Sequence, residues 1–327
     1  MAAGAGGGLT FRVPRPRRSK ESRGAAWGVL VLAFLFVLAQ EALAARVAVV
    51  LSDDSVPYEG IYQAIQAGLA GSSNAANRLY ARELTQSSLG DARMAVVVGV
   101  GAADAMAALG ARLPVLAVLV PRTWYLKTGQ VRLSEGGRRV LSAIYIDQPF
   151  ERQARLIQLA LPEARRVGVL LSAEQQWLAE ELRGALEVRQ LDLVEETVAK
   201  GERLIGPLEK VLAEVDLLLA VPDPLVFNRG TAQSVFLTSY RFGVPIVGYS
   251  QSLTRAGALV SLHSSPAQIG RQAAAWVNIA LRGPAVRLPA PAYPEFASVS
   301  VNEQVAHSLG ITVPPEAELE ERLWSER

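Results

Sequence analysis

The chain has 327 residues, of which 50% are hydrophobic and 20% charged, and this composition provides enough core for one large or two medium globular domains. It has no cysteine and two histidines, which excludes disulfides, thiolate metal sites and a cysteine-linked lipid anchor, and makes any metal site improbable. Residues 1–44 hold six of the 33 Lys and Arg residues and two of the 31 Asp and Glu residues, so the remainder carries 27 basic against 29 acidic side chains, a balance that argues against nucleic-acid binding.

Residues 1–44 have the three parts of an export signal. The segment from Arg12 to Arg23 is basic, Trp27 to Ala39 is apolar, and Ala42-Leu43-Ala44 has the small-x-small pattern of a cleavage site before Ala45. The apolar stretch is shorter than the roughly 20 residues that span a bilayer. We therefore predict a signal peptide over 1–44 and a periplasmic protein, with an uncleaved inner-membrane anchor as the alternative.

From Arg46 onward, short β-branched runs alternate with amphipathic segments. Arg46–Ser52 is continuously apolar, as strands covered on both faces are, and is followed by Ile61, Ile65 and Leu69 at helical spacing. Further strands are expected over Met94–Gly99 and Leu113–Val120, separated by a small-residue helix. This alternation of strand and helix is typical of a parallel α/β sheet.

The second half of the chain repeats this pattern. The run RVGVLLS, Arg166–Ser172, begins 120 residues after the run RVAVVLS at Arg46. Asp216–Val221 then corresponds to Met94–Gly99, and Val244–Ser250 corresponds to Leu113–Val120. Such an internal duplication predicts two similar doubly wound parallel-sheet lobes, of the α/β class, joined by a hinge.

The C-terminal part of the chain is expected to contribute to both lobes. A strand leads to a helix with Ile269, Ala273, Trp276 and Ala280 on one face, and a proline-rich crossing segment leads to a final strand. We expect lobe one to comprise 45–147 plus about 263–283, and lobe two 148–262 plus about 284–315. Residues 316–327 are expected to be a solvated tail.

In open α/β sheets ligands bind beyond the carboxyl ends of the strands, so the residues that follow each strand are the candidates for ligand contact. They combine hydroxyls, amides, aromatic rings and carboxylates, which suit a small polar or aromatic molecule. The candidates are Ser52, Asp53, Tyr58, Gly99, Gly101, Thr123, Trp124, Tyr145, Asp147, Asp223, Phe227, Asn228, Tyr249 and Ser250.

Plainer interpretations exist for several candidates. Ser52 and Asp53 are ordinary residues at a helix start, and Trp124 could pack under a loop. The stretch GVGAADAM, from Gly99, matches neither a Walker A loop nor GxGxxG, so phosphate binding is disfavoured. There is no GxSxG, no HExxH and no cysteine nucleophile, so we predict a protein without enzymatic activity, metal or cofactor.

The residues resemble the ABC transporter substrate-binding proteins of the tryptophan/tyrosine-binding type. The resemblance lies in the segment LLLAVPDPLVFNRG, in the Gly-Tyr-Ser at 248–250 and in the Gly-Arg-Gln at 270–272, and it covers most of residues 45–315. It implies a periplasmic solute-binding protein with a type I periplasmic-binding fold, whose lobes close on a ligand and present it to a permease. Carried over by position, it implies that the following residues line the site: Asp223, Phe227, Asn228, Tyr249 and Ser250 in lobe two, and Ser52, Asp53, Gly99 and Gly101 in lobe one.

In this interpretation Asp223 accepts a hydrogen bond from the ligand, Phe227 stacks on it, and Pro222 and Pro224 hold the loop rigid. The chain departs from the family pattern after the third strand of lobe one, where it reads VPRTWYLKTG and lacks the Asn-x-Thr-Gly element. We expect Trp124 or Tyr125 to fill part of the cavity there.

The leading hypothesis is a monomeric solute-binding protein that captures an amino-acid-like molecule for an ABC permease. The alternative is a periplasmic sensor or partner-binding subunit, which would report to a membrane signalling protein or assist an outer-membrane receptor. The expected partners are therefore a small-molecule ligand and a membrane protein. No nucleic acid is expected, and the only expected contact with the membrane is through the leader.

Overall fold

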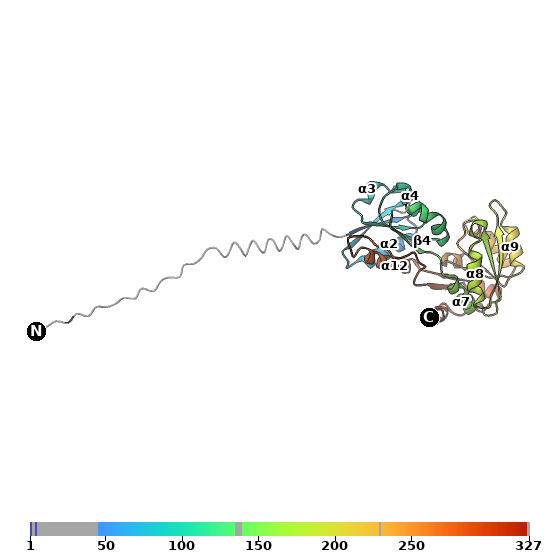
Figure 1. The fold of residues 1–327 in the computed structure, drawn as a ribbon. Coiled ribbons are helices and arrows are strands. Elements are labelled where there is room, and N and C mark those ends of the chain that lie inside the picture. The colour runs from blue at the N-terminus through green and yellow to red at the C-terminus, as the bar shows by residue number, and fades with distance from the viewer. Residues whose placement is uncertain (2–3, 5–44, 135–138, 229, 326–327) are drawn as a thin grey trace. The chain divides into compact units, whose positions relative to one another are not determined.

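The predicted apolar runs form two sheets in the computed structural model, which describes Met1, Gly4 and residues 45–134, 139–228 and 230–325 (Figure 1). The predicted signal peptide therefore lies outside the described residues, apart from Met1 and Gly4. No helix within the described ranges is long and apolar enough to cross a membrane.

The first sheet has the order β2-β1-β3-β4-β5, and all its pairs are parallel. Its strands are β1 (Ala45–Leu51), β2 (Asn74–Tyr80), β3 (Met94–Val98), β4 (Val115–Val120) and β5 (Leu141–Tyr145). The helical segments between them are α2 (Val56–Leu69), η2 (Ala81–Glu83), α3 (Gln86–Leu89), α4 (Val100–Leu109), α5 (Arg122–Trp124), the π-helix η3 (Tyr125–Gly129) and α6 (Gln130–Ser134).

The second sheet has the order β11-β10-β9-β8-β6-β7 and is parallel except for the antiparallel pair of β10 and β11. Its strands are β6 (Arg166–Ser172), β7 (Asp192–Val198), β8 (Leu217–Leu219), β9 (Ile246–Gly248), β10 (Val260–His263) and β11 (Ser298–Val301). Its helical segments are α7 (Phe150–Ala160), η4 (Ala173–Gln175), α8 (Leu178–Glu187), α9 (Ile205–Leu212), α10 (Ala232–Arg241), α11 (Gln251–Ala256), α13 (Glu303–Leu309) and α14 (Glu316–Trp324).

The two sheets have the same connectivity, which confirms the predicted fold class and the duplication. β1 lies between β2 and β3 exactly as β6 lies between β7 and β8, and β4 and β5 correspond to β9 and β10. The equivalent registers pair Val47 with Met94 and Val167 with Leu217. We refer to the sheet of β1–β5 with its helices as lobe one and to the sheet of β6–β11 with its helices as lobe two.

Helix α12 (Pro266–Ala280) returns the chain to lobe one, where it packs along α2 (Figure 1). The two helices approach closely because each has a glycine in the contact between them. A Cβ on Gly270 of α12 would lie 2.5 Å from Ala64 Cβ and 2.7 Å from the carbonyl oxygen of Ile61 in α2. A Cβ on Gly68 would likewise lie 2.6 Å from Ala274 Cβ. Close approach of backbones is therefore what holds α12 on lobe one.

Two details differ from the expected assignment of residues to lobes. His263 ends β10 in sheet two, where its Nε2 lies 2.8 Å from Ser300 Oγ, rather than beginning the lobe-one segment. The proline-rich segment after α12 lies on lobe one at Ala292 and reaches lobe two only at its end, where the Pro294 carbonyl accepts from Arg152 Nη1 of α7 at 3.2 Å. The backbone of Ala292 bonds to Ala143 and Tyr145 beside β5.

The C-terminal helix α14 is not the solvated tail that was expected. Leu319 and Leu323 are buried in the core of lobe two, and α14 packs against α7 and β11. Two of its carboxylates accept backbone N–H groups from β11, at 2.8 Å from Val299 to Glu320 and at 2.7 Å from Val301 to Glu316. The helix thereby covers an edge strand whose N–H groups would otherwise be unpaired.

We expect Leu319→Ala to lower the free energy of unfolding of lobe two by about 2–5 kcal/mol, because it removes buried methyl groups and leaves a cavity. Urea denaturation followed by circular dichroism measures this change. Glu321→Ala, on the exposed face of the same helix, is the matched control. Equal stability of the two variants would show that α14 is only loosely attached.

Candidate functional site

A small cavity lies where the carboxyl ends of strands from both sheets meet. Its volume is about 10 Å³, which is space for one water molecule or one small ligand group. Its polar lining comes from the ends of β4 and β5, from α7, from η4 and from the crossing segment: Arg122, Thr123, Asp147, Gln148, Gln153, Gln175 and Tyr293. The loop after β8 adds Val221 and Pro222.

An ion pair joins the two lobes beside this cavity. Arg122, in the first turn after β4, donates from Nη1 to both carboxylate oxygens of Glu181 in α8, at 2.9 and 2.7 Å. Both side chains are partly buried, at 22% and 34% exposed, and the guanidinium lies over the rings of Trp177 and Tyr293. Because it is shielded and supported by two rings, this pair is stronger than an ordinary surface pair.

The backbone leading to Arg122 is irregular. The pairing of β4 with β5 shifts register between Val118 and Val120, and Leu119 has a φ of 55°. A bulge of this kind bends a strand and redirects the residues after it, which is a common feature beside binding sites. The bulge precedes the turn that carries Arg122 toward lobe two.

Asp147 contributes a carboxyl group to the same cavity. Its Oδ2 accepts the backbone N–H of Arg122 at 2.7 Å. Burial raises the pKa of Asp147 to about 6, although that hydrogen bond and the nearby guanidinium act in the opposite direction. Burial also raises the pKa of Tyr249, after β9, to about 12, and the charges of Asp147 and Asp223 add to this effect. Groups from both sheets therefore share one electrostatic environment.

Four of the predicted lobe-one residues, Ser52, Tyr58, Gly99 and Gly101, lie close together, and Ser52 forms hydrogen bonds with the neighbouring backbone. Ser52 Oγ donates to the carbonyl of Val98 at 2.8 Å and accepts the N–H of Ala102 at 2.9 Å, which ties β1 to the start of α4. Gly99 has a φ of +84°, and a Cβ there would lie 2.7 Å from Ser52 Oγ and 3.0 Å from the Tyr58 hydroxyl. Gly101 also faces Ser52.

The predicted lobe-two residues are likewise engaged with the protein. Asp223 is 2% exposed, and its two oxygens accept backbone N–H groups from Ser172 at 2.8 Å and Leu225 at 2.9 Å. Asn228 closes its own turn through Pro224, Gly230 and Thr231, and Ser250 caps α11 by accepting from Leu253. Asp223 thereby joins the ends of β6 and β8, and its contact with a ligand stays a prediction.

The aromatic candidates fall into two groups. Phe227 is buried and meets Tyr249 edge-on, with ring centroids 6.4 Å apart. Tyr145 lies between the rings of Tyr125 and Tyr293, at 5.7 and 5.6 Å. Trp124 packs on Gly129 and Tyr125 is buried in the lobe-one core, so neither fills the interlobe cavity as was expected.

Thr123 and Asp147 are the predicted residues that line the interlobe cavity; Asp53 is exposed and accepts the N–H of Ser55. Gln153, Gln175 and Tyr293 were not predicted. Gln153 offered a signal, because it occupies the apolar face of α7 together with Phe150 and Ile157. A polar residue on a buried helix face calls for an explanation in the tertiary structure.

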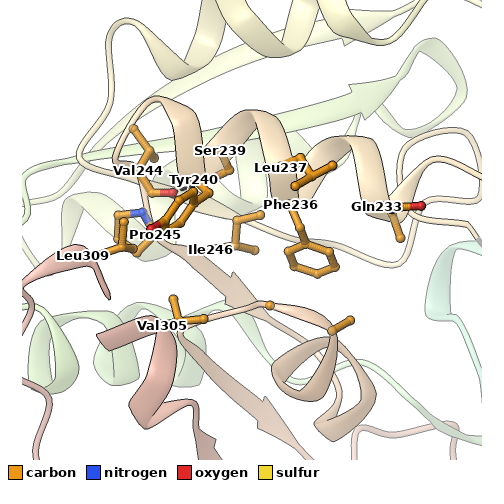
Figure 2. A pocket seen from close by; sticks show the side chains of 13 residues that line it. Gln233, Phe236, Leu237, Ser239, Tyr240, Val244, Pro245, Ile246, Val305 and Leu309 are labelled. Carbon is orange, nitrogen blue, oxygen red and sulfur yellow. Dashed lines mark hydrogen bonds between the residues drawn. The ribbon is translucent and has the colours of Figure 1, made fainter. Parts of the chain in front are cut away.

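A larger apolar hollow, of about 470 Å³, lies on lobe two between α10, α11 and α13 (Figure 2). Phe236, Leu237, Tyr240 and Val305 are among its lining residues. It includes Val244 and Pro245, which precede β9, so it lies toward the amino end of that strand. None of the predicted site residues lines this hollow.

The first expected outcome for the site concerns pH. Asp147 has an ordinary pKa of 3.8 when unfolded and about 6 in the folded protein, so its folded form retains a proton that the unfolded chain loses between pH 4 and 6. As the pH rises through this window, Asp147 therefore lowers the free energy of unfolding. The substitution Asp147→Asn removes this loss of stability. The Tm of the variant relative to the natural protein should rise between pH 4 and 8, by the equivalent of about 1–3 kcal/mol.

Differential scanning calorimetry at a series of pH values measures this difference. Asp91→Asn, at an exposed carboxylate that pairs with Arg46, controls for the loss of one negative charge. A Tm difference for Asp147→Asn that is the same at pH 4 and pH 8 would contradict the assignment.

The second expected outcome concerns the pair that joins the lobes. Glu181→Gln should broaden the distribution of lobe-to-lobe distances, changing the ratio of the arrangements about fivefold, because a pair of this kind contributes about 1 kcal/mol. The chain has no cysteine, so Gln66→Cys on α2 and Glu214→Cys after α9 provide two unique positions for spin labels.

Double electron–electron resonance spectroscopy then gives the distances. Glu180→Gln, on the same turn of α8 but with a side chain that is 88% exposed, is the control. If Glu181→Gln leaves the distribution as narrow as the control does, the pair does not hold the lobes.

Comparison with known proteins bears on the fold and the family of the chain. No curated protein matches the chain. Solved structures of similar fold include an ABC domain in complex with L-Trp from Streptococcus pneumonia, with 18% identity, a TM-score of 0.58 and coverage of 84% of this chain and 98% of that chain. A conserved domain protein from Vibrio cholerae has 20% identity, a TM-score of 0.61 and coverage of 85% and 98%.

The ligand-free, open structure of CD0873, a substrate binding protein with adhesive properties from Clostridium difficile, has 15% identity, a TM-score of 0.65 and coverage of 83% and 96%. These structures support the two-lobed type I periplasmic-binding fold. The family model described as ABC transporter substrate binding protein matches residues 47–320. The chain therefore belongs to the ABC transporter substrate binding protein family.

Proposed function

We propose that this protein captures a small amino-acid-like molecule between its two lobes and delivers it to an ABC permease. The observation that carries the proposal is the interlobe cavity, where residues after β4, β5, β6 and β8 converge on one point. The members of the family are solute-binding proteins rather than enzymes, and they work with ABC permeases. The ligand class is our inference from the lining residues.

The chemistry of the site suits a ligand that carries both signs of charge and an apolar or aromatic part. Arg122 presents a guanidinium that already binds a carboxylate in two-point fashion, that of Glu181. Asp147 presents a carboxyl group in the same cavity lining. The rings of Trp177, Tyr293 and Tyr249 lie beside these groups and offer surfaces for stacking.

The lobes would have to move for such a ligand to enter, since the cavity holds about 10 Å³. The crossing segments between the lobes are short, and they leave each core intact when the lobes rotate. The ligand's carboxylate would then replace Glu181 on Arg122, so that opening the ion pair and binding the ligand exchange one charged contact for another. Export through the leader at 1–44 would place the protein beside its permease in the periplasm.

We expect isothermal titration calorimetry to show one-site binding of an aromatic or aliphatic L-amino acid, and L-tryptophan and L-tyrosine are the first to test. Arg122→Ala should weaken that binding at least about tenfold, because a hydrogen bond to a charged group contributes roughly 1.5–3 kcal/mol. Arg132→Ala, which removes an exposed partner of Asp104 in the same lobe, is the control.

Native mass spectrometry of the protein as purified supplies the independent check, because a bound solute survives gentle purification. If all twenty L-amino acids fail to bind and no small molecule co-purifies, the proposal is wrong. If a sugar or another uncharged solute binds instead, the family function holds but the amino-acid-like ligand does not.

A further inference from the structure

Two residues that line the interlobe cavity each carry a buried side-chain oxygen without a hydrogen-bond donor among the described residues. Gln153 is 4% exposed and Gln175 is 7% exposed, and both line the cavity. The Oε1 atom of each has no partner among the described residues. Buried polar atoms are nearly always paired, so two such acceptors in one small cavity require an explanation.

The orientation of each amide group is determined by its nitrogen. Gln153 Nε2 donates to the carbonyl of Gln148 at 3.3 Å, and Gln175 Nε2 donates to the carbonyl of Pro222 at 3.3 Å. Rotating either amide by 180° would place oxygen against a carbonyl oxygen, so both Oε1 atoms remain directed away from those carbonyls. Two residues of the cavity lining therefore each hold an acceptor whose orientation is set by the hydrogen bond of its own Nε2 atom.

A third acceptor adjoins them. Asp147 lines the same cavity, and its carboxyl group accepts the backbone N–H groups of Arg122, at Oδ2, and of Asp147 itself, which leaves further lone pairs on its two oxygens. A set of two amide oxygens and one carboxyl oxygen suits a group with several N–H donors and a positive charge. A primary ammonium group has three donors, and its size is close to that of the single water molecule that about 10 Å³ can hold.

We propose that Gln153, Gln175 and Asp147 form a subsite for a primary ammonium group. This inference rests on the proposed function, since the ammonium group would be that of the captured ligand, and it assigns the two ends of the ligand: the amine to this subsite and the carboxylate to Arg122. Lobe one supplies Asp147, and lobe two supplies Gln153 in α7 and Gln175 in η4. The subsite is therefore complete only when the lobes are together.

The first test needs no ligand. Gln175→Met keeps the length of the side chain and removes the unpaired oxygen together with the long 3.3 Å bond from Nε2 to Pro222; because the unpaired oxygen costs more than that bond contributes, the Tm of the ligand-free protein should rise by about 2 °C. Gln176→Met is the matched control on the next residue, because Gln176 donates to Glu195 and accepts from Thr197. The control should lower the Tm. A fall in Tm for Gln175→Met as large as that of the control would mean that the oxygen costs the ligand-free protein no stability, and would overturn the proposal.

The second test compares L-tryptophan with indole-3-propionate, which keeps the ring and the carboxylate and lacks the amino group. We expect Gln175→Met to weaken L-tryptophan binding about tenfold, the loss of one hydrogen bond to a charged group, and to leave indole-3-propionate unchanged. Equal losses for both compounds would show that Gln175 only shapes the cavity, and would overturn the subsite.

A bare ammonium probe separates failure of the subsite from failure of the proposed function. If neither indole compound binds the natural protein, the proposed aromatic amino acid is wrong, and methylammonium chloride is compared with tetramethylammonium chloride at equal concentration. A larger rise in Tm with methylammonium, lost in Gln175→Met, supports the subsite. Equal effects of the two salts overturn it, whatever ligand the protein takes.

Discussion

Parallel pairing is the constraint on which this structure depends. Each parallel strand must end at the same edge of its sheet as its neighbours, because the chain returns over a helix to begin the next strand. The residues after β4, β5, β6 and β8 are therefore brought together although they are far apart in the chain. A sheet of hairpins would have distributed the same side chains over both ends, and no shared cavity would form.

The division into lobes depends on a second, steric condition. Helix α12 follows a strand of lobe two and yet packs on lobe one, which is possible because Gly270 and Gly68 let two helix backbones approach closely. The chain therefore crosses between the lobes several times, and the segment at each crossing is short. Such crossings permit rotation of one lobe against the other and resist their separation, and this is the mechanical requirement for a protein that encloses its ligand.

Some polar side chains of the two lobes have all their hydrogen bonds satisfied within the protein, and others keep an unpaired atom. Ser52, Asp223 and Ser250 have their hydrogen bonds satisfied by nearby backbone, so they stabilise the strand ends. Gln153 and Gln175, which are buried and keep an unpaired oxygen, cost stability in the absence of a partner. Unpaired groups therefore mark binding better than polar residue type does, since a group that is already bonded has little to offer a ligand.

From the sequence alone, the α/β class, the duplication and most strands of both lobes could be predicted, because buried parallel strands are continuous apolar runs. The polar edge strand β2 and the short β5 could not be recognised from local pattern. Strand ends were expected to carry the site, and of the predicted residues Thr123 and Asp147 line the interlobe cavity. Only the tertiary structure decided which polar side chains are hydrogen-bonded to backbone amides. It also decided that Arg122 pairs with Glu181 across the lobes, and that Gln153 and Tyr293 line the same cavity. Hydrogen-bond saturation and contacts between distant segments depend on distances in space, which residue type and spacing do not contain.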